Sequence, residues 1–282
     1  MRPVDDFLNT AWQARLDLGF ERRKEETILS RRTHQGPLRV QKPLFPEGPE
    51  LCHAIILHPP AGIAGGDRLA IDIDVGAGAQ ALLTTPGAGK WYRSAGPLAE
   101  QEVRVKVGAG GTAEWLPQES IVFDGANAHM RTTVELTGDA RYLGVETVCF
   151  GRRASGETFV NGGLRLATDI FIDGRPLWYE RGKIDGGSVL MQSPVGLAGF
   201  SVCSTVIAAG VAVAAETLAA CRAAASPEAA AQFGVTALPQ IFVGRYLGHS
   251  AEAARAWFVE LWCALRPTVI GRLAAVPRIW NT

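Results

Sequence analysis

The densest run of glycine and proline in this chain covers His58 to Ser94, HPPAGIAGGDRLAIDIDVGAGAQALLTTPGAGKWYRS. A helix cannot accommodate this density, and the spacing is too regular for a disordered segment. Glycine adopts backbone angles that other residues avoid, and Pro59, Pro60 and Pro86 remove donors from any hydrogen-bonded ladder. The backbone is therefore bent at fixed places, and the segment predicts a turn-rich β framework.

Alternation of apolar and polar residues continues the β pattern along the chain. Every second residue is apolar from Trp12 to Phe20, and Leu69 to Val75 and Val103 to Val107 repeat this period of two. Such a period predicts strands with one buried and one solvated face. We expect Asp72 and Asp74 on a solvated face.

A faint internal repeat connects these strands. A glycine turn followed by an apolar strand recurs from Val75, Val107, Leu136 and Ile172. A period of roughly thirty residues is typical of stacked units that bury one another's faces. Residues 1–200 are therefore predicted to form an elongated, stacked, β-helix-like framework, and a twisted β-sandwich is the competing architecture.

The character of the chain changes after residue 200. Residues 201–213 predict a buried strand and residues 241–247 another. Between them, residues 214–232 are rich in alanine and predict a helix, with Pro227 starting a second short turn.

A second helix is expected near the C-terminus. Ser250 precedes an apolar stripe of helical period, and Pro267 is expected to end the helix. Residues 201–282 therefore predict a small α+β portion with two helices, packed on the mainly β framework of residues 1–200. We expect one continuous structural unit, because no linker separates the two parts.

Composition limits the class of partner. Lys and Arg total 28, as do Asp and Glu, so no overall positive field attracts nucleic acid or an anionic membrane. The longest apolar region, Val202 to Ala215, is shorter than the roughly 20 residues that span a bilayer. Five scattered cysteines and no secretory signal in MRPVDDFLNT predict a cytoplasmic protein.

The sequence contains no complete copy of several familiar catalytic and binding motifs. The segment ending at Lys90 lacks the first glycine of a phosphate-binding loop and has Trp91 where Ser or Thr is required. Ser120 lies outside any nucleophile elbow. The neighbours Cys52 and His53 point to opposite faces of a strand, so they cannot easily share a metal.

Carboxylates within apolar strands are the more informative candidates. Glu146 and Glu180 have apolar flanks, and Asp67, Glu119 and Asp124 lie at turns nearby. A buried carboxylate must be paired, protonated or bound to a cation. Two interpretations stay open: a hydrated acidic path for a cation, or salt bridges to Arg68, Arg152 and Arg181.

Three long motifs in the same order make the chain resemble the UreD (UreH) family of urease accessory proteins. They are the segment from His58 to Ser94, EWLPQESIVFDGA at Glu114 to Ala126, and PRIWNT at Pro277 to Thr282. The resemblance extends from about Trp12 to the last residue.

The resemblance implies a non-catalytic scaffold with an elongated, mainly β fold and two helices. It implies docking on the urease apoprotein subunits together with UreF and the GTPase UreG, with homodimerisation through that accessory complex. It implies no tightly bound cofactor and only transient nickel, passing through an internal tunnel. Glu146 and Glu180 are then the first candidates to line the tunnel, with Asp67 near its entrance. The remaining motif and interface candidates are His58, Lys90, Tyr92, Arg93, Glu119 and Asp124.

Two other classes of protein compete with this interpretation. One is a β-helical polysaccharide hydrolase or lyase that uses Asp72 with Asp74, or Glu119 with Asp124, as acid and base. Such a pair must oppose each other across a sugar, whereas Asp72 and Asp74 share one strand face. The other is a binding module without any metal role.

Overall fold

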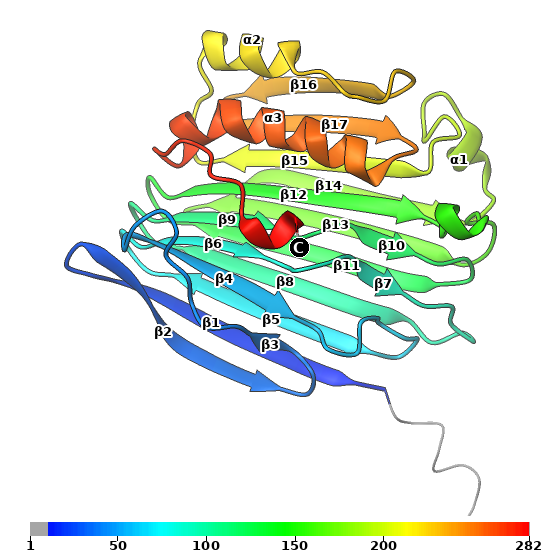
Figure 1. The fold of residues 1–282 in the computed structure, drawn as a ribbon, viewed down its shortest axis with the longest axis horizontal. Helices are drawn as coiled ribbons and strands as arrows, with labels where there is room; N and C mark the ends of the chain where they lie inside the picture. The colour runs from blue at the N-terminus through cyan, green and yellow to red at the C-terminus, as the bar shows by residue number, and fades with distance from the viewer. Residues whose placement is uncertain (1–10, 282) are drawn as a thin grey trace, which may run out of the picture.

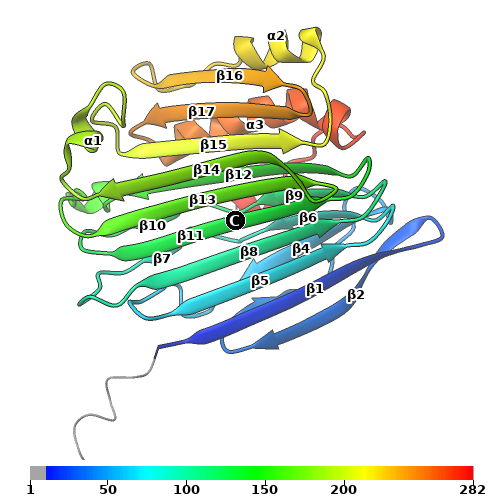
Figure 2. The ribbon, with the colours of Figure 1, turned by 180° about the vertical axis from the view of Figure 1, so that it is seen from behind.

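The computed structural model describes residues 11–281 of the chain. Within these residues the strands form two sheets, of seven and ten strands, that face each other (Figure 1 and Figure 2). The whole segment MRPVDDFLNT, on which the prediction about a secretory signal depends, lies outside the described residues, as does Thr282.

The smaller sheet is mainly parallel and lies in front in Figure 2. Its two edge strands, β14 and β2, pair antiparallel with their neighbours. In spatial order its strands are β14 (Arg175–Asp185), β13 (Gly163–Ile172), β11 (Asn127–Leu136), β8 (Ala99–Val107), β5 (Arg68–Val75), β1 (Gln13–Arg23) and β2 (Glu26–Gln35).

The larger sheet is parallel from β4 to β12 and antiparallel beyond β12. In spatial order its strands are β16 (Gln232–Leu238), β17 (Ile241–Gly248), β15 (Val202–Ala209), β12 (Arg141–Phe150), β9 (Thr112–Leu116), β6 (Gln80–Thr84), β4 (Leu51–Leu57) and β3 (Arg39–Val40). Beside β12, parallel pairing adds β10 (Ser120–Val122) and β7 (Gly89–Trp91).

The chain forms stacked coils by crossing from the smaller to the larger sheet and returning. The strand pairs β5 with β6, β8 with β9, and β11 with β12 each belong to one coil, and parallel pairing joins each coil to the next. The predicted β-helix-like framework is therefore confirmed, and the β-sandwich alternative was wrong.

The first three predicted glycine turns are the crossings between the sheets. Gly78, Gly110 and Gly138 have φ of 67°, 69° and 58°, in the left-handed region that glycine tolerates best. The turns also bond to one another, since the Gly78 amide donates to the Ala109 carbonyl oxygen at 2.9 Å and the Gly110 amide to Asp139 Oδ1 at 2.6 Å. Stacking of these turns holds one end of the coils together.

The fourth predicted turn is different. Asp173 and Gly174, with φ of 48° and 73°, form a two-residue connection between the antiparallel strands β13 and β14. Two successive residues with positive φ favour a tight hairpin, which returns the chain to the same sheet. The repeat prediction was therefore wrong at Ile172.

The C-terminal part extends the larger sheet and adds helices. Helix α2 (Ala215–Ala223) is shorter than predicted, no second helical turn follows at Pro227, and β16 begins at Gln232. Helix α3 (Ala251–Val269) begins at Ser250, whose side chain accepts from the Ala253 amide at 3.1 Å, and continues two residues past Pro267. The remaining helical elements are α1 (Val189–Gln192), η2 (Arg153–Ser155) and η3 (Arg278–Asn281).

Two apolar cores hold these layers. One lies between the sheets and includes Leu16, Ile71 and Val105, from neighbouring strands of the smaller sheet. The other lies between the larger sheet and α3, where Trp257 and Trp262 are fully buried. In Figure 1, α3 crosses the front of the larger sheet over β15 and β17.

A buried ionic cluster fastens α3 to the larger sheet. The Arg266 guanidinium contacts Glu114 at 2.9 Å and Glu47 at 2.6 Å, and Trp262 Nε1 donates to Glu114 at 2.7 Å. Burial favours the neutral form of Glu47, but hydrogen bonds from His53 and Arg266 outweigh it and lower the pKa of Glu47 to about 2. Every charge in this cluster therefore has a partner, as burial requires.

Candidate functional site

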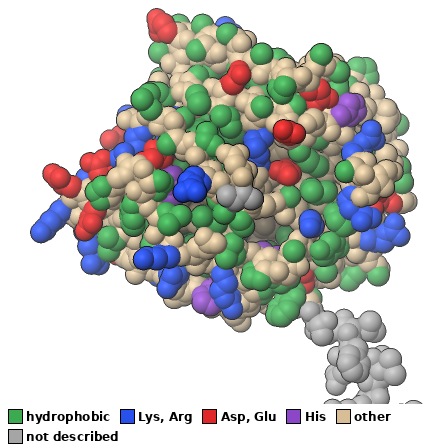
Figure 3. Space-filling view, viewed as in Figure 1, with side chains coloured by type: hydrophobic (Ala, Val, Ile, Leu, Met, Phe, Trp, Pro, Cys, Tyr) green, Lys and Arg blue, Asp and Glu red, His purple; other side chains and the backbone are tan. Residues whose placement is uncertain are grey.

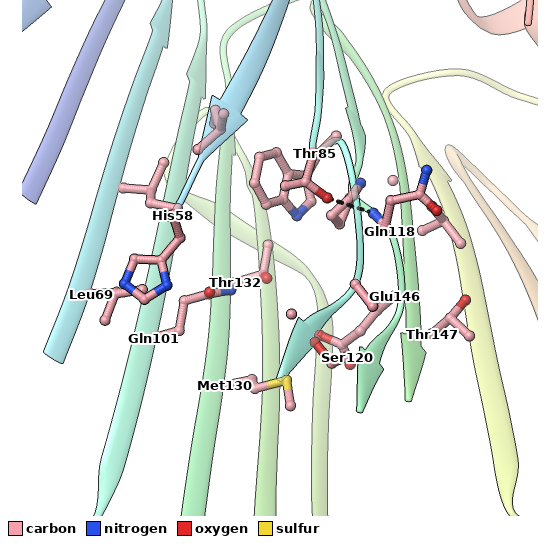
Figure 4. A pocket seen from close by; sticks show the side chains of 18 of the residues that line it. His58, Leu69, Thr85, Gln101, Gln118, Ser120, Met130, Thr132, Glu146 and Thr147 are labelled. Atoms are coloured by element: carbon pink, nitrogen blue, oxygen red, sulfur yellow. Dashed lines mark hydrogen bonds between the residues drawn. The ribbon is translucent and has the colours of Figure 1, made fainter. Parts of the chain in front are cut away.

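A cavity of about 300 Å³ lies between the two sheets and crosses the coils of the stack (Figure 4). Its lining extends from Leu38 and Ile56, near β3 and β4, to Glu180 on β14 and Thr205 on β15. The cavity therefore reaches from the first coils to the edge of the smaller sheet.

Oxygen-bearing side chains are concentrated towards one end of the cavity, which Met130, Leu166 and Ile207 also line. Apolar side chains gather towards the β4 end: Leu38, Ile56, Ile63, Leu69 and Ile71. Oxygen-bearing side chains gather towards the β14 end: Thr132, Glu146, Thr168, Glu180 and Thr205. Strand register explains part of this row, because Thr132 pairs with Thr168, and Thr168 pairs with Glu180.

Glu146 presents a carboxyl group to the cavity. In Figure 4 Glu146, Thr132 and His58 point into the space between the strands. Across residues 11–281, the Glu146 carboxyl group has no hydrogen-bond or ion-pair partner. Burial, reinforced by the charge of Glu180, raises the pKa of Glu146 to about 7, although Arg245 opposes the rise. A neighbouring cation would favour the ionised form.

Glu180 lies at the same end of the cavity but has partners. Its carboxylate accepts from the Arg245 guanidinium and from Trp178 Nε1, the latter at 3.3 Å. The Glu180 side chain is 26% exposed, so it lies at the border between cavity and solvent. The two carboxylates suspected from the sequence therefore line one cavity, from opposite sheets.

His58 and Lys90 also line the cavity. Burial lowers the pKa of His58, and the charge of Asp67 opposes this only partly, so the imidazole is neutral near pH 7. Within the described part of the chain, His58 Nε2 has no hydrogen-bond partner and Lys90 has no ion pair. A nitrogen ligand and a cation thus border the same space as the two carboxylates.

Asp67 does not line the cavity. Its two carboxylate oxygens accept from the amides of Trp12 and Ala64, at 2.7 and 2.8 Å, and the residue is buried. The carboxylate fixes the turn before β5. The charge of Asp67 still acts on His58, which lines the cavity, so the expected place of Asp67 near a tunnel entrance stays a prediction.

The other candidates hold loops together. Tyr92 packs edge-on against Phe123, and Arg93 pairs with Asp124 at 3.4 Å. Asp124 also accepts from the amides of Val160 and Asn161. Glu119 pairs with Arg255 of α3 at 3.0 Å.

The salt bridges considered as the alternative do not form. Arg68, Arg152 and Arg181 pair with Glu100, Glu157 and Asp169 respectively. The partner of Glu180 is Arg245, which sequence reasoning missed. Arg245 gives the same signal as the two glutamates, a single charge within an apolar strand.

The cysteines and histidines do not form a metal centre. Across residues 11–281, no group of three or more His, Cys, Asp or Glu side chains is arranged to hold an ion. Burial raises the pKa of the Cys149 and Cys203 thiols to about 12, so they stay protonated.

The outer surface shows no extended area of one charge on the face seen in Figure 3, where acidic, basic and hydrophobic side chains alternate. Some apolar side chains are strongly exposed, among them Val189, Val195 and Leu273 at 84%, 95% and 81%. None of the helices in residues 11–281 has both the length and the hydropathy needed to cross a bilayer.

Fold and site together define an elongated two-sheet β framework with an oxygen-lined internal cavity. Comparison with known proteins agrees with this class and identifies the family. The family described as UreD urease accessory protein matches residues 13–281. The chain belongs to this family.

Individual relatives agree over nearly the whole chain. The urease accessory protein UreD of Azoarcus sp. (strain BH72) is 53% identical over 271 residues, which cover 96% of this chain and 94% of the relative. UreD of Dechloromonas aromatica (strain RCB) is 54% identical over 275 residues, covering 96% and 95%. UreD of Janthinobacterium sp. (strain Marseille) is 50% identical over 271 residues, covering 96% and 92%.

Proposed function

We propose that this chain assists the maturation of urease as a non-catalytic factor in the cytoplasm. It docks on the urease apoprotein together with UreF and UreG, homodimerises through that accessory complex, and helps to deliver nickel to the urease active site. It holds nickel only in transit and has no tightly bound cofactor. The family match and the named relatives support the link to urease.

The observation that supports a nickel path is the placement of Glu146 and Glu180 on one internal cavity. Divalent ions bind nitrogen and sulfur ligands increasingly tightly towards nickel and copper, so selective delivery needs a guided route. Carboxylate, hydroxyl and water oxygens bind nickel more weakly than imidazole or thiolate does, which permits release at the far end. His58 adds one nitrogen ligand to this route.

The polysaccharide enzyme is not favoured by the structure. Asp72 and Asp74 lie on the outer face of the smaller sheet, where Asp72 pairs with Arg15 at 3.0 Å and Asp74 with Arg31 at 3.5 Å. Two acids on one face, each bound to an arginine, cannot flank a sugar as acid and base.

The test is urease activation in cells that express the urease subunits, UreF and UreG with a tagged form of this chain. We expect the tagged chain to co-purify with urease, UreF and UreG. We expect Glu146→Gln with Glu180→Gln to lower the nickel content and activity of urease by roughly tenfold or more, as loss of metal-contacting groups does elsewhere. Glu135→Gln is the matched control, because Glu135 is half exposed on the outer face and pairs with Lys106.

Three outcomes distinguish the parts of this proposal. Full activation by the double variant, with all partners still bound, would leave a docking role and remove the nickel path. Loss of partner binding in the double variant would mean that the two glutamates act on assembly. Failure of the unmodified chain to bind any of these partners would refute the proposal as a whole.

A further inference from the structure

Arg245 lies where the cavity meets the edge of the smaller sheet. In Figure 2 the smaller sheet ends at β14, whereas β15, β17 and β16 of the larger sheet continue beyond it. Arg245 on β17 pairs in register with Thr205, which in turn pairs with Glu146. Directly paired residues point to the same face of a sheet, so these three side chains form a row on one face of the larger sheet. Glu146 and Thr205 line the cavity, and Arg245 continues the row beyond it.

The Arg245 guanidinium bridges the two sheets. Nη1 donates to the Glu180 carboxylate of β14 and, at 2.9 Å, to Thr205 Oγ1. The Arg245 side chain is 47% exposed and that of Glu180 is 26% exposed. The ion pair therefore stands at the border between the polar end of the cavity and solvent.

We propose that Arg245 is a tethered cation that occupies Glu180 until a divalent cation displaces it. This inference rests on the proposed function, since it requires nickel to reach the two carboxylates. A guanidinium keeps its charge at every physiological pH, so it competes permanently for Glu180. An exposed ion pair contributes little stability, so a divalent ion that binds both Glu146 and Glu180 can replace it.

The competing cation sets how tightly the cavity holds nickel. While Arg245 occupies Glu180, nickel must both displace it and approach a positive charge. This keeps binding weak and reversible, as passage requires. An open carboxylate pair would instead retain the ion.

Isothermal titration of the purified full chain with Ni²⁺ tests this inference. We expect Arg245→Gln to lower the dissociation constant roughly tenfold, because removal of a unit charge near a divalent ion removes their repulsion. Arg245→Lys keeps the charge and should stay close to the unmodified chain, whereas Glu180→Gln should bind more weakly. If Arg245→Gln does not fold, Arg245→Met replaces it.

Arg104→Gln is the control variant. The Arg104 side chain is also 47% exposed and paired with a glutamate, Glu102, but both lie on the outer face of the smaller sheet. We expect its nickel affinity to be unchanged. Thermal unfolding of each variant checks that the fold is retained. If the Arg245–Glu180 pair is only structural, Arg245→Gln should lower the midpoint of thermal unfolding and leave the dissociation constant for nickel unchanged.

The possible results separate this inference from the proposed function. An unchanged dissociation constant in Arg245→Gln, with weaker binding in Glu180→Gln, would overturn the role of Arg245 and leave the nickel path intact. Equally tighter nickel binding in Arg104→Gln would also overturn the role of Arg245, because the loss of any positive charge would then explain the effect. If neither the unmodified chain nor Arg245→Gln binds Ni²⁺, the nickel path and the role of Arg245 both fail.

Discussion

Replacement of Glu146 by glutamine should change how the stability of the protein depends on pH. The pKa of Glu146 is raised from its ordinary value of 4.5 to about 7, chiefly by burial. Below pH 4.5 the carboxyl group is protonated in both the folded and the unfolded chain, so it costs nothing. As the pH rises from 4.5 to 7, the unfolded chain releases the proton while the folded chain keeps it, so the folded state loses stability progressively until about pH 7.

The size of this effect follows from the two pKa values. A difference of about 2.5 between them corresponds to roughly 3 kcal/mol of unfolding free energy at high pH. Because the carboxyl group borders a cavity that water can enter, we expect about 2 kcal/mol in practice. Glutamine is neutral at every pH, so Glu146→Gln should gain this amount above pH 8 and only about a quarter of it at pH 5.

Urea unfolding of the purified chain at pH 5, 6, 7 and 8 measures this difference. Glu135→Gln, half exposed on the outer face, controls for the loss of one negative charge. Parallel stability profiles for Glu146→Gln and the unmodified chain over this range would refute the reasoning. The Glu146 carboxyl group would then be solvated like any surface acid.

Three further predictions concern the framework. Glu114→Ala leaves the buried Arg266 guanidinium with one carboxylate fewer, so the unfolding free energy measured in urea should fall by about 3 kcal/mol. The double variant Glu114→Ala with Arg266→Leu should recover part of this loss. If the losses of the two single variants simply add in the double variant, this reasoning is contradicted. Gly162→Ala places a Cβ 2.1 Å from the Ala126 carbonyl oxygen at a φ of +85°, so the unfolding free energy should fall by more than about 2 kcal/mol. Gly156→Ala, where no atom lies near the added Cβ, should lower it by about 1 kcal/mol. Equal losses in the two variants would be inconsistent with this packing. The pKa of Glu47, lowered to about 2, makes its contribution present above pH 4.5 and lost as the pH falls towards 2, so Glu47→Gln should flatten the acid side of a urea-midpoint profile.

Local sequence patterns were sufficient for several strands and for most of the coils, whereas β2, β4, β13 and β16 were not predicted. Periods of two at β1, β5 and β8 and the glycine turns after Val75, Val107 and Leu136 each depend on a few adjacent residues. The turn after Ile172 contains the same residue types, yet it folds back within one sheet. Which sheet receives the next strand depends on pairing partners far along the chain, and a local pattern does not contain that information.

The C-terminal helices show a second limit. The alanines of residues 214–232 favour a helix, but helix propensity is a weak preference that tertiary contacts override. Helix α2 ends at Ala223, and Glu228 in the segment after it accepts from the amides of His249 and Ser250 instead of continuing a helix. Pro267 lacks the donor to the Cys263 carbonyl and its ring crowds that carbonyl, but only two residues follow it in α3 and Cys263 is exposed to solvent. The helix can therefore continue to Val269.

The candidate site was partly predictable. The sequence indicates which charged residues are buried, but it does not indicate which residues they pair with. A single charge within an apolar strand must face a partner or a polar cavity, and that argument found Glu146 and Glu180. Applied to the strand IFVGRYLG, it would also have found Arg245. It could not find the pairing, because Arg245 meets Glu180 only through the register of β17 with β15 and the edge position of β14. Asp67 shows the opposite case: a turn offers backbone amides to a carboxylate, so a buried acid there needs no ion. An acid in the middle of a strand has no such local donors, since the ladder uses them, and is therefore the stronger indicator of a site.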